Sequence, residues 1–140
     1  RGSGWTCPPS ACNRPTAMSS DQPMHLRTGI RAERLAEKLL VAADMVVLER
    51  NFRSRFGEID LICRSQRELV FVEVRYRAHT HFGSAAASVN LAKQRKLTKT
   101  AQYYILTHNH LSKLFMRFDV IGININRQAQ WIKGAFLATV

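Results

Sequence analysis

The segment GEIDLICRSQRELVFVEVRYR constrains the fold more than any other part of this chain. It holds two apolar runs rich in Val, Ile and Phe, which predict β-strands at residues 57–63 and 68–76. These strands also carry three acidic residues, Glu58, Asp60 and Glu73. Acidic side chains are rarely buried without a partner. The neighbours of these carboxylates should therefore indicate what the protein does.

The rest of the chain alternates helical and strand-like patterns. Apolar residues at helical spacing predict two helices, and short apolar runs predict further strands. In chain order we expect a helix at residues 28–43, strands at 45–52, 57–63 and 68–76, a helix at 88–108, and strands at 113–125 and 130–136. Strands interleaved with helices favour an α/β fold, in which helices cover both faces of a mixed sheet.

The chain of 140 residues is long enough for one domain, which we expect at residues 24–140. Residues 1–23 are rich in Ser, Pro, Gly and Thr, and we expect a disordered tail or an artificial extension there. No apolar run reaches the roughly 18 residues of a membrane span. The three cysteines do not suggest a disulfide framework. We therefore expect a cytoplasmic protein with no membrane partner.

The charge of the chain favours an anionic partner. Its 21 Lys and Arg residues exceed its 10 Asp and Glu residues, for a net charge of +11. Such an excess favours nucleic acid first, although a basic surface can also serve solubility alone. Lys93, Lys96 and Lys99 lie in the first half of the second predicted helix, where they are expected to form a positive surface.

Side chains on a strand alternate between the two faces of the sheet. This alternation predicts that Glu58, Asp60 and Ile62 share one face of their strand. On the next strand it places Glu73 and Arg75 on one face. The acids are therefore expected to meet across the pair of strands, if the register allows it.

A two-residue turn at Gln66–Arg67 sets a register in which Asp60 faces Glu73 and Glu58 faces Arg75. Two facing carboxylates repel each other, by roughly 1 kcal/mol in water and about four times more at a protein-like dielectric. A shared proton, a neighbouring Arg or Lys, or a divalent cation could offset this repulsion.

Oxygen ligands of this kind suit Mg²⁺ or Mn²⁺. Arg75 cannot bind a metal, but its guanidinium can hold a phosphate. Phosphodiester hydrolysis uses such a pairing of metal-binding acids with a phosphate-binding cation. The alternative interpretation is a strand face with ordinary cross-strand salt bridges, such as one between Glu58 and Arg75.

These residues belong to a longer set of motifs: GIRAERLAEKLL, LERNFRSRFGEIDLI, LVFVEVRYR, FGSAAASVNLAKQRKL, RFDVIG and WIKGAF. With them the sequence resembles the YraN family, small bacterial proteins placed among the PD-(D/E)xK nuclease-like folds and similar to archaeal Holliday-junction resolvases. The matching stretches cover most of residues 29–136. This resemblance implies a restriction-endonuclease-like fold with an αβββαβ core, and the similarity to resolvases implies that a homodimer can form.

By this resemblance Asp60 is the motif aspartate and Glu73 is the acid of the (D/E)xK element. Glu33 matches the helix glutamate that completes the metal site in related nucleases. Glu33, Asp60 and Glu73 would then hold Mg²⁺ or Mn²⁺. Arg75 stands where the pattern has Lys, and this departure leaves phosphate binding possible while removing a side chain that could lose a proton.

The sequence thus predicts a metal-dependent, endonuclease-like protein that hydrolyses phosphodiester bonds in DNA, with branched or recombining DNA as the expected substrate. The catalytic set would be Glu33, Asp60, Glu73 and Arg75. The residues expected to contact DNA are Arg75, Arg77, Lys93, Lys96 and Lys99. Two alternatives remain open: a non-catalytic nucleic-acid-binding module with the same fold, and a protein whose acids only support a partner surface.

Overall fold

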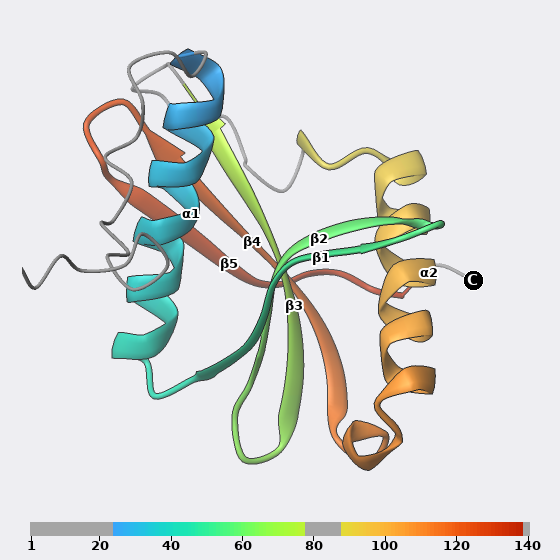
Figure 1. The fold of residues 1–140 in the computed structure, drawn as a ribbon. Helices are drawn as coiled ribbons and strands as arrows, with labels where there is room; N and C mark the ends of the chain where they lie inside the picture. Colours follow the sequence, from blue (N-terminus) through green and yellow to red (C-terminus); the bar gives the residue numbers. More distant parts are fainter. Residues whose placement is uncertain (1–23, 78–87, 139–140) are drawn as a thin grey trace, which may run out of the picture.

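The computed structural model describes residues 24–77 and 88–138 (Figure 1). The elements are α1 (Met24–Ala42), β1 (Val46–Ser54), β2 (Gly57–Arg64), β3 (Glu68–Arg77), α2 (Leu91–Thr107), the short 3₁₀ helix η2 (Asn109–Leu111), β4 (Phe115–Asn124) and β5 (Ala129–Phe136). The predicted order is confirmed, except that α1 begins before residue 28. The tail predicted at residues 1–23 lies outside the described residues. Within these ranges, no helix combines the length and apolar character needed to cross a membrane.

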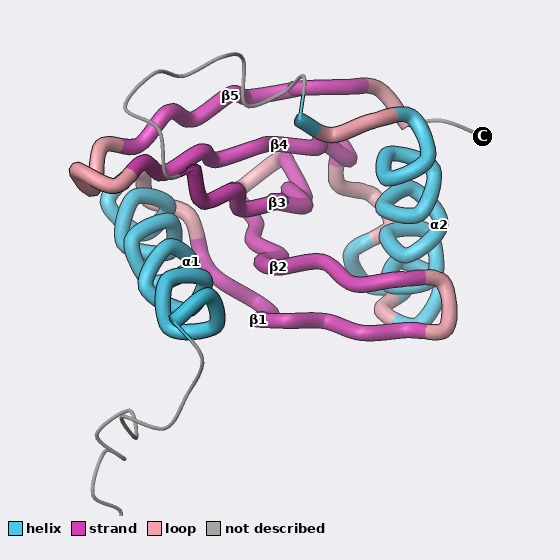
Figure 2. The backbone as a smooth tube through the Cα atoms, turned by 90° about the horizontal axis from the view of Figure 1, so that it is seen from above, coloured by secondary structure: helices cyan, strands magenta, loops and turns pink. Residues whose placement is uncertain are grey.

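The five strands form one sheet in the order β1-β2-β3-β4-β5. All neighbouring pairs are antiparallel except β3 and β4, which run parallel. Parallel neighbours need a crossover connection, and α2 lies within it. Seen from above, α1 and α2 lie on opposite sides of the sheet (Figure 2). The predicted α/β fold, with an αβββαβ core in a mixed sheet flanked by helices, is therefore confirmed, and β5 extends the sheet beyond β4.

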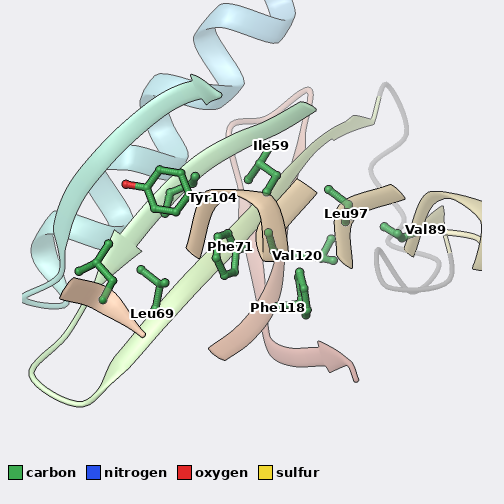
Figure 3. Close-up of a cluster of buried hydrophobic side chains, with 11 residues drawn as sticks. Ile59, Leu69, Phe71, Val89, Leu97, Tyr104, Phe118 and Val120 are labelled. Carbon is green, nitrogen blue, oxygen red and sulfur yellow. The ribbon is translucent and has the colours of Figure 1, made fainter. Parts of the chain in front are cut away.

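Both faces of the sheet carry a hydrophobic core. The cluster under α2 is drawn in Figure 3 and includes Ile59, Leu69, Phe71, Leu97, Tyr104, Phe118 and Val120. The cluster under α1 includes Ala36, Leu40, Leu61, Val70, Val72 and Ile121. Alternate residues of β3 enter the two clusters, so this central strand is buried on both faces. Burial on both faces makes β3 a rigid support for any polar side chain that it carries.

The β2–β3 hairpin has the predicted register. Its turn is at Gln66–Arg67, and the ladder runs up to the pair formed by Leu61 and Val72. The next positions in this register are Asp60 and Glu73, where the ladder has ended. The two acids therefore lie at the point where β2 and β3 separate.

The alternation of side chains on β2 breaks at Asp60. Ile59 and Ile62 both pack in the cluster under α2, whereas Leu61 packs in the cluster under α1. The opposite position on β1 is Asn51, which has a left-handed backbone with φ of 51°. Asn adopts this conformation more readily than most residues, because its short polar side chain can bond locally. The predicted shared face of Glu58, Asp60 and Ile62 is therefore wrong.

The predicted pairing of Glu58 with Arg75 is also wrong. Glu58 lies opposite Arg53 on β1, and Arg53 Nε is 3.5 Å from Glu58 Oε1. Both side chains are exposed, so the pair contributes little to stability. The ladder between β2 and β3 ends before it reaches Glu58, and Arg75 pairs with Glu73 instead.

Asp119 on β4 shows how this fold satisfies a buried acid. Arg117 donates to both of its carboxylate oxygens, at 2.8 and 2.9 Å. Trp131 Nε1 donates at 2.8 Å and the Gly134 N–H at 3.0 Å. The two bonds from Trp131 and Gly134 join β4 to β5, and all four hold a carboxylate with no exposed surface. A fully bonded acid of this kind is structural, in contrast to the acids described next.

Candidate active site

Two carboxyl groups meet where β2 and β3 separate. Asp60 Oδ2 accepts a hydrogen bond from the Val74 backbone N–H at 2.8 Å. The side chain of Glu73 is only 7% exposed, and it shares a hydrogen bond with Asp60. Two carboxyl oxygens can bond to each other only if one of them carries a proton. The structure thus brings together the two acids that the sequence predicts to face each other.

The pair holds its proton more tightly than ordinary acids do. Burial and then the charge of Asp60 raise the pKa of Glu73 from 4.5 to about 7, although Lys93 and Arg75 act to lower it. Burial also raises the pKa of Asp60, against the hydrogen bonds from Val74 and Glu73. Near neutral pH the pair therefore changes its charge, which is a property common at functional sites.

Arg75 and Lys93 both reach the carboxylate of Glu73. Arg75 Nε lies 3.4 Å from Glu73 Oε2, and Lys93 Nζ lies 3.6 Å from the same oxygen. Both distances exceed the 2.7–2.9 Å of a strong charge-assisted hydrogen bond. The two cations therefore balance the acids electrostatically, and each can still donate to a further anion.

Arg75 is incompletely satisfied. Its Nη2 reaches the carbonyl oxygen of Ser88 at 3.4 Å. Its Nε is buried and has no hydrogen-bond partner in the described part of the chain. A buried N–H without an acceptor is costly. A phosphate oxygen or a water molecule beside Glu73 would remove this cost.

Lys93 is positioned by the start of α2. The side chain of Asn90 caps the helix by accepting from the Lys93 backbone N–H at 2.8 Å. Gln94 is fixed in the same turn, because its side chain donates to the Val89 carbonyl at 3.0 Å. The sequence predicts a DNA contact for Lys93, and the resemblance to related nucleases also suggests that Lys93 or Gln94 reaches the site. The contact of Lys93 with Glu73 joins a helix to a strand across the crossover, and spacing along the chain does not reveal it.

Glu33 on α1 interacts with Asp60, one member of the acid pair. It is half-buried and hydrogen-bonds to the Asn51 side chain, which acts to lower its pKa. Burial first, and then the charges of Asp60 and Glu58, raise the pKa of Glu33. Glu33 therefore lies on the same side of the molecule as Asp60. Asn51 was missed by sequence reasoning, although an Asn within a strand pattern is itself unusual.

The three acids are not a ready-made metal cage. In the described ranges, no three His, Cys, Asp or Glu side chains are grouped closely enough to hold a metal ion. Mg²⁺ keeps several water ligands and often binds through only one or two carboxylates. Asp60 and Glu73 meet that smaller requirement, since a cation could replace their shared proton. These residues fit a water-rich Mg²⁺ or Mn²⁺ site, and the role of Glu33 as a third ligand stays a prediction.

The other predicted DNA-binding residues surround this site at greater distance. Lys96 and Lys99 are exposed on α2, beyond Lys93 along the helix. Arg77 is half-buried at the end of β3, two residues after Arg75. Their placement is compatible with contacts to a polyanion, and their role stays a prediction.

Known proteins match this chain over most of its length. Residues 32–123 match the sequence profile of the "Uncharacterised protein family UPF0102". A UPF0102 protein of Saccharophagus degradans is 48% identical over 112 residues, which cover 80% of this chain and 94% of that protein. A UPF0102 protein of Methylobacillus flagellatus is 45% identical and covers 79% of this chain and 96% of its own.

Among solved structures, that of Pyrococcus furiosus SfsA in complex with Ca²⁺ is similar, with a TM-score of 0.32 and 9% identity. The match covers 78% of this chain and 63% of SfsA. This likeness is too distant to carry a functional argument. The sequence matches are close, and they show that the chain belongs to the UPF0102 family, which is the YraN family.

Proposed function

We propose that this protein is a metal-dependent DNA endonuclease that hydrolyses phosphodiester bonds. The observation that carries the proposal is the buried Asp60–Glu73 pair, flanked by Arg75 and Lys93. In this arrangement, acids that can hold a divalent cation lie beside cations that can hold a phosphate. Phosphodiester hydrolysis needs both functions within a few ångströms.

The acids would hold the metal. Asp60 is oriented by the Val74 N–H, so one carboxylate oxygen is fixed by the backbone while the other remains available. Glu73 is fixed on a strand buried on both faces. A bound Mg²⁺ or Mn²⁺ would lower the pKa of a water molecule and offset negative charge on the phosphate. Glu33, whose pKa is raised in part by the charge of Asp60, would be the third carboxylate ligand.

The cations would hold the phosphate. The Arg75 Nε–H beside Glu73 has no hydrogen-bond partner within the described part of the chain, so it is available to a phosphate oxygen. Arg cannot supply the proton transfer that a Lys at this position could. Lys93 nevertheless brings an ammonium group to the same carboxylate, from a helix instead of the strand. The two residues together offer more positive charge than a single motif lysine would.

DNA is the partner that the charge supports best. The net charge is +11, and Lys96 and Lys99 extend the basic surface of α2 away from the acids. Each phosphate neutralised by such a side chain would add to the salt dependence of binding. Branched DNA as the substrate and a homodimer as the working form remain expectations from the family resemblance.

Cleavage of a labelled four-way junction with Mg²⁺ or Mn²⁺ tests the proposal. The wild-type protein should release defined products. Asp60→Asn should slow their formation roughly a hundredfold or more, which is the usual effect of removing one group that stabilises charge in the transition state. Binding of the same junction in EDTA should persist in the variant. Asp44→Asn is a matched control, because Asp44 is exposed in the turn between α1 and β1.

Two results would count against cleavage as the function. If the wild-type protein binds the junction but releases no product with either cation, the chain is a non-catalytic nucleic-acid-binding module. If Asp60→Asn cleaves as fast as the wild type, the activity belongs to another site or to a contaminant.

A further inference from the structure

A pocket lies between the β1–β2 turn and α2, and none of the acids of the candidate active site lines it. Its volume is about 340 Å³. Its lining residues are Arg55, Phe56, Lys99, Gln102, Tyr103 and Leu106. The lining therefore combines two cations with two aromatic rings and includes no acid. We call it the Phe56–Tyr103 pocket.

The rings of this pocket are partly uncovered. The ring centres of Phe56 and Tyr103 are 5.9 Å apart and tilted by 57°, so they do not cover each other face to face. Tyr103 is 39% exposed, and Leu106 beside it is 79% exposed. Arg55 places its guanidinium 4.8 Å from the centre of the Phe56 ring. A flat, electron-rich ligand with negative charge nearby would find both stacking surfaces and counter-charges here.

The pocket is held in place by close packing of the β1–β2 turn on α2. Gly57 has φ of 152°, and a Cβ added there would come within 3.2 Å of Thr100 Oγ1 and 3.6 Å of the Lys96 Cβ. The backbone N–H of Phe56 donates to the Ser54 hydroxyl at 3.1 Å, which fixes the turn. The hairpin reaches across to α2 in Figure 1. The pocket walls are thus preformed.

A basic stripe connects this pocket to the acids. Lys93, Lys96, Lys99 and Tyr103 follow each other at intervals of three or four residues, so they lie along one side of α2. Lys93 contacts Glu73 at one end of the stripe, and Tyr103 lines the pocket at the other. At a rise of 1.5 Å per residue, the two ends are about 15 Å apart along the helix. This length corresponds to a few nucleotides of a strand.

We propose that the Phe56–Tyr103 pocket binds an unpaired base of the DNA strand whose phosphates lie along α2. In a paired duplex, the faces of the bases are covered by their neighbours, and only their edges are accessible in the grooves. A base must leave the stack before it can lie against Tyr103. The pocket therefore selects DNA with unpaired nucleotides, such as a splayed arm or an open junction, over intact duplex.

This inference rests on the proposed function only in taking DNA as the ligand, and binding without cleavage tests it. Fluorescence anisotropy in EDTA compares two probes of equal length, a duplex with one single-stranded arm and a full duplex. Tyr103→Leu keeps an apolar side chain but removes the ring. It should weaken binding of the splayed probe about tenfold and leave binding of the duplex unchanged. Tyr103→Trp should restore the preference.

Phe115→Leu is the matched control, because Phe115 is a 73% exposed aromatic residue at the start of β4 and does not line the pocket. It should bind both probes as the wild type does. A base analogue such as 2-aminopurine, placed in turn along the unpaired arm, should report stacking at one position in the wild type. Tyr103→Leu should lose this signal.

An equal loss of affinity for both probes in Tyr103→Leu, or no loss for either, would overturn the inference. Thermal unfolding of the variants establishes that any loss is not caused by a damaged fold. The proposed nuclease activity fails by a different measurement, the absence of cleavage with Mg²⁺ and Mn²⁺. A protein that discriminates the two probes through Tyr103 but never cuts DNA would retain the pocket and lose the proposed catalysis.

Discussion

The Asp60 carboxylate accepts a hydrogen bond from the Val74 backbone N–H at 2.8 Å, just beyond the last paired residues of β2 and β3. A side chain here takes the place that a backbone carbonyl would have in a continued ladder. One oxygen of Asp60 is therefore oriented by the backbone of a strand buried on both faces. The second carboxyl group, Glu73, precedes Val74 directly, so a single strand fixes both acids.

The raised pKa of Glu73 predicts how stability depends on pH. Folded Glu73 keeps its proton up to about pH 7, whereas the unfolded chain loses it near 4.5. Between these values the folded state binds more protons, so the free energy of unfolding falls as pH rises. The shift corresponds to roughly 3 kcal/mol. Glu73→Gln should therefore gain up to about 3 kcal/mol over the wild type at pH 8 and nothing at pH 4, measured by urea denaturation.

Glu58→Gln is the control for this prediction, since Glu58 is exposed. Its unfolding free energy should follow that of the wild type at every pH. A wild-type stability that does not fall between pH 4.5 and 7 relative to Glu73→Gln would contradict the proton shared with Asp60.

Removal of Lys93 should raise the pKa of Glu73 further. The ammonium group of Lys93 favours the charged carboxylate, so its loss favours the protonated form. Carbon NMR of the glutamate carboxyl groups during a pH titration measures this change in Lys93→Met. Lys96→Met removes an exposed charge three residues along the same helix and should shift Glu73 less. Equal shifts in both variants would mean that the Lys93 contact is not specific.

Asn51 provides a paired test of backbone and side chain. Asn51→Gly keeps the left-handed conformation but loses the hydrogen bond to Glu33, so the pKa of Glu33 should rise. Asn51→Val loses the hydrogen bond to Glu33 and also disfavours the left-handed conformation. A β-branched residue in this conformation should lower the free energy of unfolding by about 1–3 kcal/mol. Denaturant titrations of the two variants separate these effects. If the Val variant is as stable as the Gly variant, β1 does not need the left-handed backbone conformation at residue 51.

Loss of Asp119 should destabilise the fold without touching the proposed site. Asp119→Ala leaves the Trp131 Nε1–H and the Gly134 N–H without their acceptor, while Arg117 keeps its hydrogen bond to Glu68 at 2.8 Å. Each buried donor left without an acceptor costs about 1–3 kcal/mol. Thermal unfolding followed by tryptophan fluorescence should show this loss. A variant as stable as the wild type would show that water replaces the carboxylate.

The central hairpin could be predicted from the sequence because its determinants are local. Two strand-like runs on either side of Gln66–Arg67 fix the register, and the register brings Asp60 next to Glu73. The order of helices and strands could be predicted from the spacing of hydrophobic residues, because this spacing is also a local property of the sequence. Neither inference required knowledge of residues distant in the chain.

The remaining features depend on contacts between distant segments or on a single backbone angle. Strict alternation fails at Asp60, and Asn51 at the opposite position on another strand has a positive φ. Lys93 reaches Glu73 only because α2 crosses back over the sheet. The Phe56–Tyr103 pocket requires the β1–β2 turn to lie on α2. The spacing of apolar residues along the chain predicts single helices and strands, but it does not predict a contact between two of them.

The parallel pairing of β3 with β4 also has a consequence for how the protein folds. The hairpin that carries Asp60 and Glu73 closes a short loop, whereas α2 is held against the sheet by a strand pair that spans Glu68 to Phe115. Long-range parallel pairing is slow compared with hairpin formation. During synthesis, Asp60 and Glu73 would therefore meet beside Arg75 of the same hairpin before Lys93 of α2 reaches Glu73.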